Sequence, residues 1–286
     1  MTAGAPGPVI IVGAGRAGTG IGLALAMAGF PVTLVSRDAP RRVGPLDIRP
    51  YGDPTLPTGT APWILAVPDR LIAATCRALH ESGFLGASSV VGHLSGALPA
   101  SILTDAIGPL AGRFSAHPLL AFPLPFPPRP MPHGTTVLIE GDPTGELVAH
   151  ALFGAAGAET AAVDPARKPL VHAAAVLSAN LAAALVWSAA DALRDSGVPD
   201  PLKVSTRLLK SLVDNLGDRP DAAALTGPIA RGDAPTVLAN LAALEARDPS
   251  LGRLYRDLAL RLADALRDAG TLPEVPWRTI REILES

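Results

Sequence analysis

The sequence predicts an α/β domain built on a parallel sheet, followed by an all-helical domain. In the first half, short β-branched runs alternate with helical stretches, which is typical of a parallel α/β sheet. Beyond about residue 163 the apolar residues follow helical spacing in long segments. The 286 residues are enough for two domains that each bury a core. We expect the α/β domain to span 1–163 and the helical domain 164–286.

The expected elements follow from these patterns in chain order. The predicted strands are 9–12, 32–35, 63–67, 89–93, about 113–116 and about 136–140. The predicted helices are one ending near 28, 69–82, 166–196, 201–216, a segment after 236, 251–269 and 277–284. Residues 38–62 are expected to be irregular. The proline-rich segment 122–130 is expected to form a polyproline surface loop rather than a loop that covers a site.

Composition and charge exclude several classes of protein. The net charge of −2 gives no broad cationic surface, so nucleic acid is not expected as a partner. The single cysteine and the lack of a signal-peptide pattern favour a cytoplasmic protein. Residues 170–190 have the length of a membrane span without a charge, but their alanine-rich composition favours burial between protein surfaces over lipid. The histidine spacing predicts no metal site.

A glycine-rich turn follows the first predicted strand. It matches G-x-G-x-x-G and consists of Gly13, Ala14, Gly15, Arg16, Ala17 and Gly18. In this setting the first glycine permits a tight turn, the second lets the backbone approach a pyrophosphate, and the third lets helix and strand pack closely. The helix N-terminus adds free N–H groups and a partial positive charge. We favour a dinucleotide-binding Rossmann domain over a turn without a ligand.

The end of the second strand indicates which dinucleotide binds. NAD enzymes usually place an acidic residue there to bind the ribose 2′-hydroxyl. This chain has Ser36 and Arg37, which can bind a 2′-phosphate, and Arg41 and Arg42 could add charge. Asp38, as a displaced acid, is the contrary observation. We expect NADP(H) in preference to NAD(H).

Two further turns lie at the same predicted edge of the sheet. Val67 and Pro68 follow the third strand and are expected near the adenosine half of the cofactor. Ser95 and Gly96 follow the fourth strand and are expected near the nicotinamide. The alternative for each pair is turn formation alone.

Several strings then resemble a known family. They are the fingerprint at 13–18, and further 94–97, 117–119, 172–180 and 225–233, the last being Leu-Thr-Gly-Pro-Ile-Ala-Arg-Gly-Asp. With them the chain resembles the Rossmann-like family whose C-terminal half is known as domain of unknown function 2520. That family is similar to pyrroline-5-carboxylate reductase, 6-phosphogluconate and 3-hydroxyisobutyrate dehydrogenases and prephenate dehydrogenase. The resemblance implies a dinucleotide-dependent oxidoreductase with a helical dimerisation domain.

The candidates for proton transfer are an amide and two imidazoles. By the resemblance, Asn180 stands where 6-phosphogluconate-type enzymes have an asparagine, but Val176 replaces their lysine four residues earlier. His172 lies on the same predicted helix and is a reasonable acid or base, the alternative being helix packing. His117-Pro118 resembles a dipeptide near the substrate of prephenate dehydrogenases, and a structural histidine is the alternative. His93 is expected to be structural.

A last segment resembles the carboxylate-binding turn of pyrroline-5-carboxylate reductase. By this similarity Thr226, Gly227 and Thr236 are expected near an anionic substrate group, with Arg231 as a charge partner. The alternative is helix capping and an Arg–Asp pair. The predicted function is an NADP(H)-dependent oxidoreductase of a small, carboxylate-bearing carbonyl, imine or hydroxy compound bound between the domains. A homodimer through the helical domain is expected, and a regulator without catalysis is the alternative.

Overall fold

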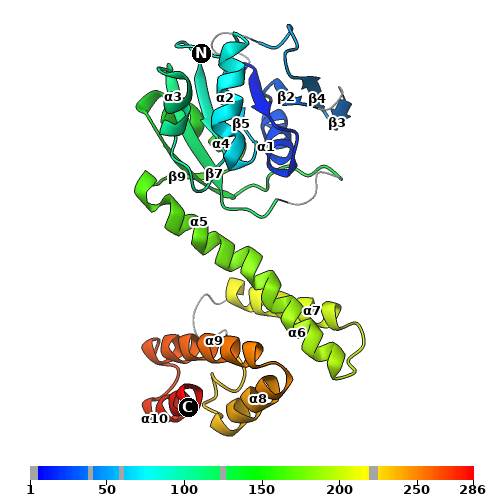
Figure 1. The fold of residues 1–286 in the computed structure, drawn as a ribbon, viewed down its shortest axis with the longest axis vertical. Helices are drawn as coiled ribbons and strands as arrows, with labels where there is room; N and C mark the ends of the chain where they lie inside the picture. Colours follow the sequence, from blue (N-terminus) through cyan, green and yellow to red (C-terminus); the bar gives the residue numbers. More distant parts are fainter. Residues whose placement is uncertain (1–5, 38–40, 58–60, 123–126, 219–224) are drawn as a thin grey trace. The chain divides into compact units, whose positions relative to one another are not determined.

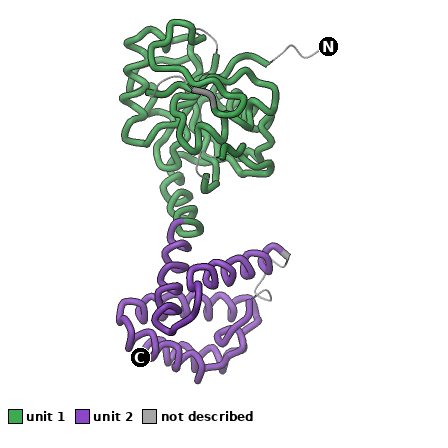
Figure 2. Tube along the Cα trace, turned by 90° about the vertical axis from the view of Figure 1, so that its right-hand side faces the viewer, with its two compact units in different colours: residues 1–179 green, residues 180–286 purple. Residues whose placement is uncertain are grey.

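The computed structural model describes residues 6–37, 41–57, 61–122, 127–218 and 225–286. They form two compact units, Met1–Ala179 and Asn180–Ser286 (Figure 2). The first unit includes the start of a helical run, because Lys168 is buried against its sheet. The domain boundary expected after residue 163 stays a prediction.

The first unit is built on one sheet, in which nine strands are described (Figure 1). Their order across the sheet is β3-β4-β2-β1-β5-β6-β7-β8-β9. The strands are β1 Val9–Val12, β2 Val32–Ser36, β3 Arg41–Val43, β4 Leu46–Pro50, β5 Trp63–Leu65, β6 Val90–His93, β7 Gly112–Pro118, β8 Thr136–Gly141 and β9 Glu159–Ala162. All neighbouring pairs are parallel except β3 with β4 and β7 with β8.

Helices cover both faces of this sheet, because successive side chains of its buried strands point to opposite sides. In β1, Val9 and Ile11 join the core that contains residues of α1 (Arg16–Met27) and α4 (Pro143–Ala155). Ile10 and Val12 join the core on the other face, with α2 (Ile72–Glu81) and α3 (Ser101–Ile107). The fold class predicted for this half of the chain is confirmed.

The structure corrects the prediction at three places. Residues expected to be irregular contain the hairpin β3–β4, whose turn includes Gly44 at φ +61°. The sheet is not wholly parallel, since β8 runs antiparallel to β7. Strand β9 and helices α3 and α4 were not expected at all. Of the proline-rich segment, residues 123–126 lie outside the described part, so its polyproline character stays a prediction.

The long helix expected over 166–196 is present as Pro165–Asp195. It consists of a 3₁₀ turn, α5 (Lys168–Val176), a π-helical turn (Leu177–Leu181) and α6 (Ala182–Asp195). By length and composition alone it could cross a membrane, with a mean hydropathy of 1.8. The described residues do not bury this helix as expected, since Leu170 and Trp187 are 74% and 61% exposed.

The second unit is helical, as predicted. After α6 come α7 (Pro201–Asp218), α8 (Ala234–Arg247), α9 (Pro249–Asp268) and α10 (Glu274–Glu285). A separate core forms where α8, α9 and α10 meet, around residues such as Leu241, Leu266 and Ile280. The helical unit thus has an interior of its own.

Candidate functional site

The glycine-rich turn between β1 and α1 has no room for a side chain at two of its three glycines. Gly13 has φ +119°, and a Cβ there would collide with the carbonyl oxygen of Ala66 at the end of β5. A Cβ on Gly18 would collide with the carbonyl oxygen of Gly13. The first and third glycines are therefore required by the fold itself.

The second glycine is different, because no described atom lies within 4 Å of the place a Cβ would take on Gly15. Its backbone is extended (φ −77°, ψ −167°), a conformation open to any residue. Gly15 is also the N-cap of α1 and has no side chain to bond the first amides of that helix. The residues present fit a dinucleotide pyrophosphate, whose oxygens accept from such amides and whose charge the helix N-terminus favours.

The end of β2 has a cationic and an aromatic side chain close together. Ser36 is the last residue of β2 and pairs in register with Pro50 of β4, and Arg37 is exposed. Tyr51 directly follows β4. Burial raises the pKa of Tyr51, while its hydrogen bond with Thr75 and the positive charge of Arg37 lower that pKa. Arg37 and Tyr51 therefore lie within electrostatic reach of each other. Asp38, the residue that argued for NAD(H), lies outside the described part of the chain.

The turns after β5 and β6 are joined by a side-chain hydrogen bond. Val67 is half-buried and Pro68 exposed, and Asp69 follows them at the start of a 3₁₀ turn. Ser95 Oγ donates to Asp69 Oδ2 at 2.8 Å and accepts from the amide of Leu98 at 2.9 Å. The hydroxyl of Ser95 is thus bonded within the protein, which leaves the backbone of this turn as the part that a ligand can meet.

Two histidines from distant parts of the sequence meet at Gly96. His117 is on β7 and His172 on α5, and their ring centroids are 5.5 Å apart with an interplanar angle of 69°. A Cβ on Gly96 would be 2.6 Å from His117 Nε2 and 2.6 Å from His172 Nδ1. Of the three residues predicted for proton transfer, the structure therefore brings these two together, beside the turn predicted for the nicotinamide.

The sequence analysis missed a buried lysine in the same place. Lys168 is 2% exposed, and its Nζ donates to Glu140 Oε1 at 3.2 Å and to Ser115 Oγ. Burial lowers the pKa of Lys168, and the charge of Glu140 and its hydrogen bond oppose that shift. The search for a lysine four residues before Asn180 overlooked one that lies four residues before His172. A signal was present in the sequence: Glu140 is the one carboxylate in the apolar strand β8, and a buried carboxylate needs a cationic partner.

Asn180 is the first residue of the second unit. It lies in the π-helical turn and is exposed. The amide was expected to need a partner inside a buried helix, but exposure to water removes that requirement. Its role in ligand contact stays a prediction.

The segment expected to bind an anion opens α8. Gly227 has φ +107°, and Thr226 and Arg231 are exposed. Thr236 donates from its amide to Asp233 Oδ1 (3.2 Å) and from its hydroxyl to Asp233 Oδ2 (2.7 Å). These bonds hold the pKa of Asp233 below its usual range and cap the helix. Capping, which the sequence left open as the alternative for Thr236, is present, and substrate binding by this segment stays a prediction.

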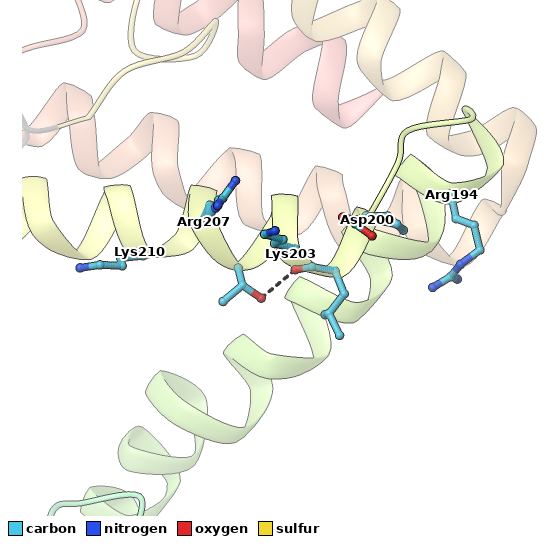
Figure 3. A pocket seen from close by; sticks show the side chains of 8 residues that line it. Arg194, Asp200, Lys203, Arg207 and Lys210 are labelled. Carbon is cyan, nitrogen blue, oxygen red and sulfur yellow. Dashed lines mark hydrogen bonds between the residues drawn. The ribbon is translucent and has the colours of Figure 1, made fainter.

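A separate hollow of about 660 Å³ lies on the helical unit, at α6 and α7. Arg194, Lys203, Arg207 and Lys210 gather along it with Asp200 (Figure 3). Two of these cations are already paired with acids of their own helices, Arg194 with Asp191 and Lys210 with Asp214. None of the predicted site residues lines this hollow. Among the described residues, no group of three metal-ligating side chains is found.

Comparisons with known proteins agree with the fold. Residues 135–262 match the family called domain of unknown function 2520. This match confirms the resemblance found in the sequence. None of the curated proteins compared with the chain matches it.

Solved structures match nearly the whole chain. A Bacteroides fragilis protein named as a candidate NADP oxidoreductase is 20% identical, with TM-score 0.70 over 91% of this chain and 98% of that one. The Plasmodium falciparum pyrroline carboxylate reductase, solved with NADP bound, is 10% identical, with TM-score 0.59 over 96% and 98%. An imine reductase from Streptomyces aurantiacus is 17% identical, with TM-score 0.56 over 98% and 100%. At these identities the likeness shows the fold, a Rossmann-type domain followed by a helical one.

Proposed function

We propose that the protein is an NADP(H)-dependent oxidoreductase that acts on a small, carboxylate-bearing carbonyl, imine or hydroxy compound. The observation that carries the proposal is the open space beside Gly15. The fold explains Gly13 and Gly18, but no contact within the described chain explains a glycine at position 15. Close approach of a pyrophosphate to the backbone explains it.

The residues of the first unit divide the work of holding the cofactor. The loop 13–18 and the first amides of α1 would bind the pyrophosphate, and Ser36 and Arg37 the 2′-phosphate. Val67 and Pro68 are proposed beside the adenosine, and Ser95 and Gly96 beside the nicotinamide. When bound, NADP(H) supplies or accepts a hydride.

The side chains of the protein must then transfer a proton and bind the negative charge of the substrate. We assign the proton to His117 and His172, whose rings meet at Gly96. Asn180 is proposed as a polar contact to the substrate. For the carboxylate we propose Thr226, Gly227, Arg231 and Thr236. The support is that Thr226 and Arg231 are exposed donors, which can bind an anion.

Nucleotide binding tests the proposal directly. NADPH is expected to bind with saturable fluorescence enhancement and to raise the melting temperature, and NADH to bind more weakly. Gly15→Val should lower the melting temperature of the free protein only by the small cost of a valine at the N-cap of α1. It should weaken NADPH binding about tenfold or more, because its side chain points to where the phosphates would lie.

The matched control for this substitution is Gly86→Val. Gly86 also has no described atom within 4 Å of its would-be Cβ, but it lies outside the proposed site. It should affect neither melting nor binding. Equal melting with and without both nucleotides, or equal binding by wild type and Gly15→Val, would show that the loop is not a dinucleotide site.

A regulator that binds the dinucleotide without turnover is the second candidate. The observation that favours it is the burial of Lys168, whose amine is already bonded to Glu140 and Ser115. Turnover of NADPH with any of a panel of keto acids and cyclic imines, abolished by His172→Ala, would exclude this candidate. Tight binding with no turnover in both proteins would establish it.

We also propose that the protein is a cytoplasmic homodimer joined through the helical unit. The support is a set of exposed apolar side chains on α6 and α7, where Trp187, Leu208 and Val213 are 61%, 65% and 58% exposed. A groove of about 570 Å³ lies between these two helices and is lined mostly by leucine, valine and alanine. Apolar faces of this extent are uncommon on monomers and typical of interfaces.

A further inference from the structure

A bridge of buried side chains ties the start of α5 to the turn after β6. Lys168 Nζ donates to Ser115 Oγ on β7, and Ser115 Oγ donates to the carbonyl oxygen of Ser95 at 3.2 Å. Lys168 also donates to Glu140 on β8. One amine therefore connects a helix, two strands and the beginning of the turn.

The same ion pair holds the far end of that turn. Glu140 Oε1 accepts from the amide of Ala100 at 2.7 Å, and the Glu140 side chain is 6% exposed. The turn from Ser95 to Ala100 is thus fixed at both ends by bonds that lead to Lys168. Gly96 lies within it.

This bridge contributes more to geometry than to stability. Taking both charges out of water is costly, and a buried pair recovers little net stability over apolar residues of similar size. Its hydrogen bonds, in contrast, leave α5 and the turn little freedom to shift relative to each other. The ion pair of Lys168 and Glu140 therefore fixes the position of the other side chains on α5.

One helical turn after Lys168, α5 carries His172. Residues four apart lie on the same face of a helix, so anchoring Lys168 to the sheet also fixes the imidazole of His172. The tolerance is small, because a single added methyl at Gly96 would collide with both imidazoles. A shift of about an ångström would separate the rings or force them together.

Each imidazole directs one ring nitrogen toward Gly96. His117 Nδ1 lies 3.2 Å from the carbonyl oxygen of Leu94, which only accepts, so Nδ1 carries a hydrogen and Nε2 is left as an acceptor. His172 Nδ1 is buried and has no hydrogen-bond partner among the described residues. One acceptor and one unpartnered nitrogen therefore point to the same place.

We infer that Lys168 is a positioning residue, which holds His172 beside His117 so that the two imidazoles bind a single proton as a pair. A second proton would place two positive rings 5.5 Å apart and close to the ammonium of Lys168. Asp69 faces the pair from the turn after β5, Glu140 is bonded to Lys168, and His93 on β6 is neutral. The transfer of this proton to a substrate rests on the proposed function. The pairing of the two histidines does not depend on it.

Histidine NMR on the full-length protein without nucleotide tests the inference. In the wild type, the Cε1–Hε1 signals of both rings should report two titration steps separated by more than about 1 pH unit, each ring responding to both steps. In Lys168→Met the separation should fall below about 1 pH unit, with one step for each ring. Lys203→Met, an exposed lysine of α7, is the control and should leave both steps unchanged.

The result separates positioning from a simple effect of charge. Loss of the lysine charge alone would raise both steps together and keep their separation, and that outcome would overturn the inference. If Lys168→Met does not fold, Lys168→Met/Glu140→Leu removes both buried charges and should fold and show the same loss of coupling. Failure of this double variant to fold would show that the bridge is a stability element, against the inference. Failure of the proposed function would appear separately, as coupled histidines in a protein that binds no NADPH.

Discussion

His93 shows at the scale of one residue how burial decides what an imidazole can do. It is 0% exposed on β6, accepts from the amide of Ser95 at 3.2 Å and donates to the carbonyl oxygen of Pro99 at 3.1 Å. Burial lowers its pKa to about 4. Both ring nitrogens are in use, so His93 has the structural role expected from the sequence, while His117 and His172 each keep a nitrogen for other partners.

The lowered pKa of His93 predicts a loss of stability in mild acid. The unfolded chain binds a proton on this ring near pH 6.5 but the native protein only near pH 4, so the stability present above pH 6.5 is lost as the pH falls toward 4. The loss should be about 2 to 3 kcal/mol between pH 7.5 and 4.5, measured by urea unfolding.

Two glutamine variants isolate this contribution from those of the carboxylates. His93→Gln should reduce the pH dependence, whatever it does to the stability at neutral pH. His80→Gln, at an exposed histidine of α2, should leave it unchanged. A pH dependence equal in His93→Gln and the wild type would contradict the assignment.

At the scale of elements, α5 to α7 pose a different problem from the helices that cover the sheet. Helices α1 to α4 contribute to two cores that the sheet completes. Helix α7 in contrast leaves Leu208 and Val213 mostly exposed, and Trp187 of α6 is also exposed. Among the described residues of the helical unit, none covers these apolar side chains. We propose that the same helices of a second copy cover them.

This predicts that charge on the exposed face of α7 breaks the assembly. The wild type should have the mass of two chains by light scattering at micromolar concentration. Leu208→Asp/Val213→Asp should have the mass of one, because two carboxylates would be buried without partners in the interface.

Leu238→Asp is the control for this experiment, since Leu238 on α8 is exposed to a similar degree, 51%. It should keep the wild-type mass. A single-chain mass for the wild type would rule out the dimer, and a dimeric double variant would rule out this face of α7 as its interface.

At the scale of the whole molecule, the chain has separate interiors for its two units. The sheet unit has a core on each face of the sheet, and the helical unit has its own core around Leu241, Leu266 and Ile280. A unit with its own core can unfold as a cooperative body of its own.

Calorimetry is therefore expected to resolve two transitions. NADPH at 100 times its dissociation constant should stabilise the unit that contains Gly13 and Gly15 by about 2.7 kcal/mol and raise only that transition. Gly15→Val should lose this response. A single transition raised as a whole would show instead that the chain unfolds as one body.

Much of this architecture could be predicted, because its signals are local. The strand, glycine turn and helix at 9–28 lie next to one another in the chain, and their chemistry needs nothing distant to be recognised. The hairpin β3–β4 also had a local signal, the Gly44-Pro45 turn between Val43 and Leu46, which its charged and proline-containing strands concealed. Strand β9 had none, since its sequence Glu-Thr-Ala-Ala lacks the β-branched pattern.

The sequence by itself determined the α/β and helical halves and the loop that a dinucleotide would approach, because hydrophobic spacing and glycine chemistry act over a few residues. Only the tertiary structure decided that β8 reverses direction, that Lys168 is buried on Glu140, and that His117 meets His172 at Gly96. Lys168 and Glu140 are 28 residues apart in the sequence, and His117 and His172 are 55 apart. Their meeting depends on how strands and α5 pack, which no local pattern encodes.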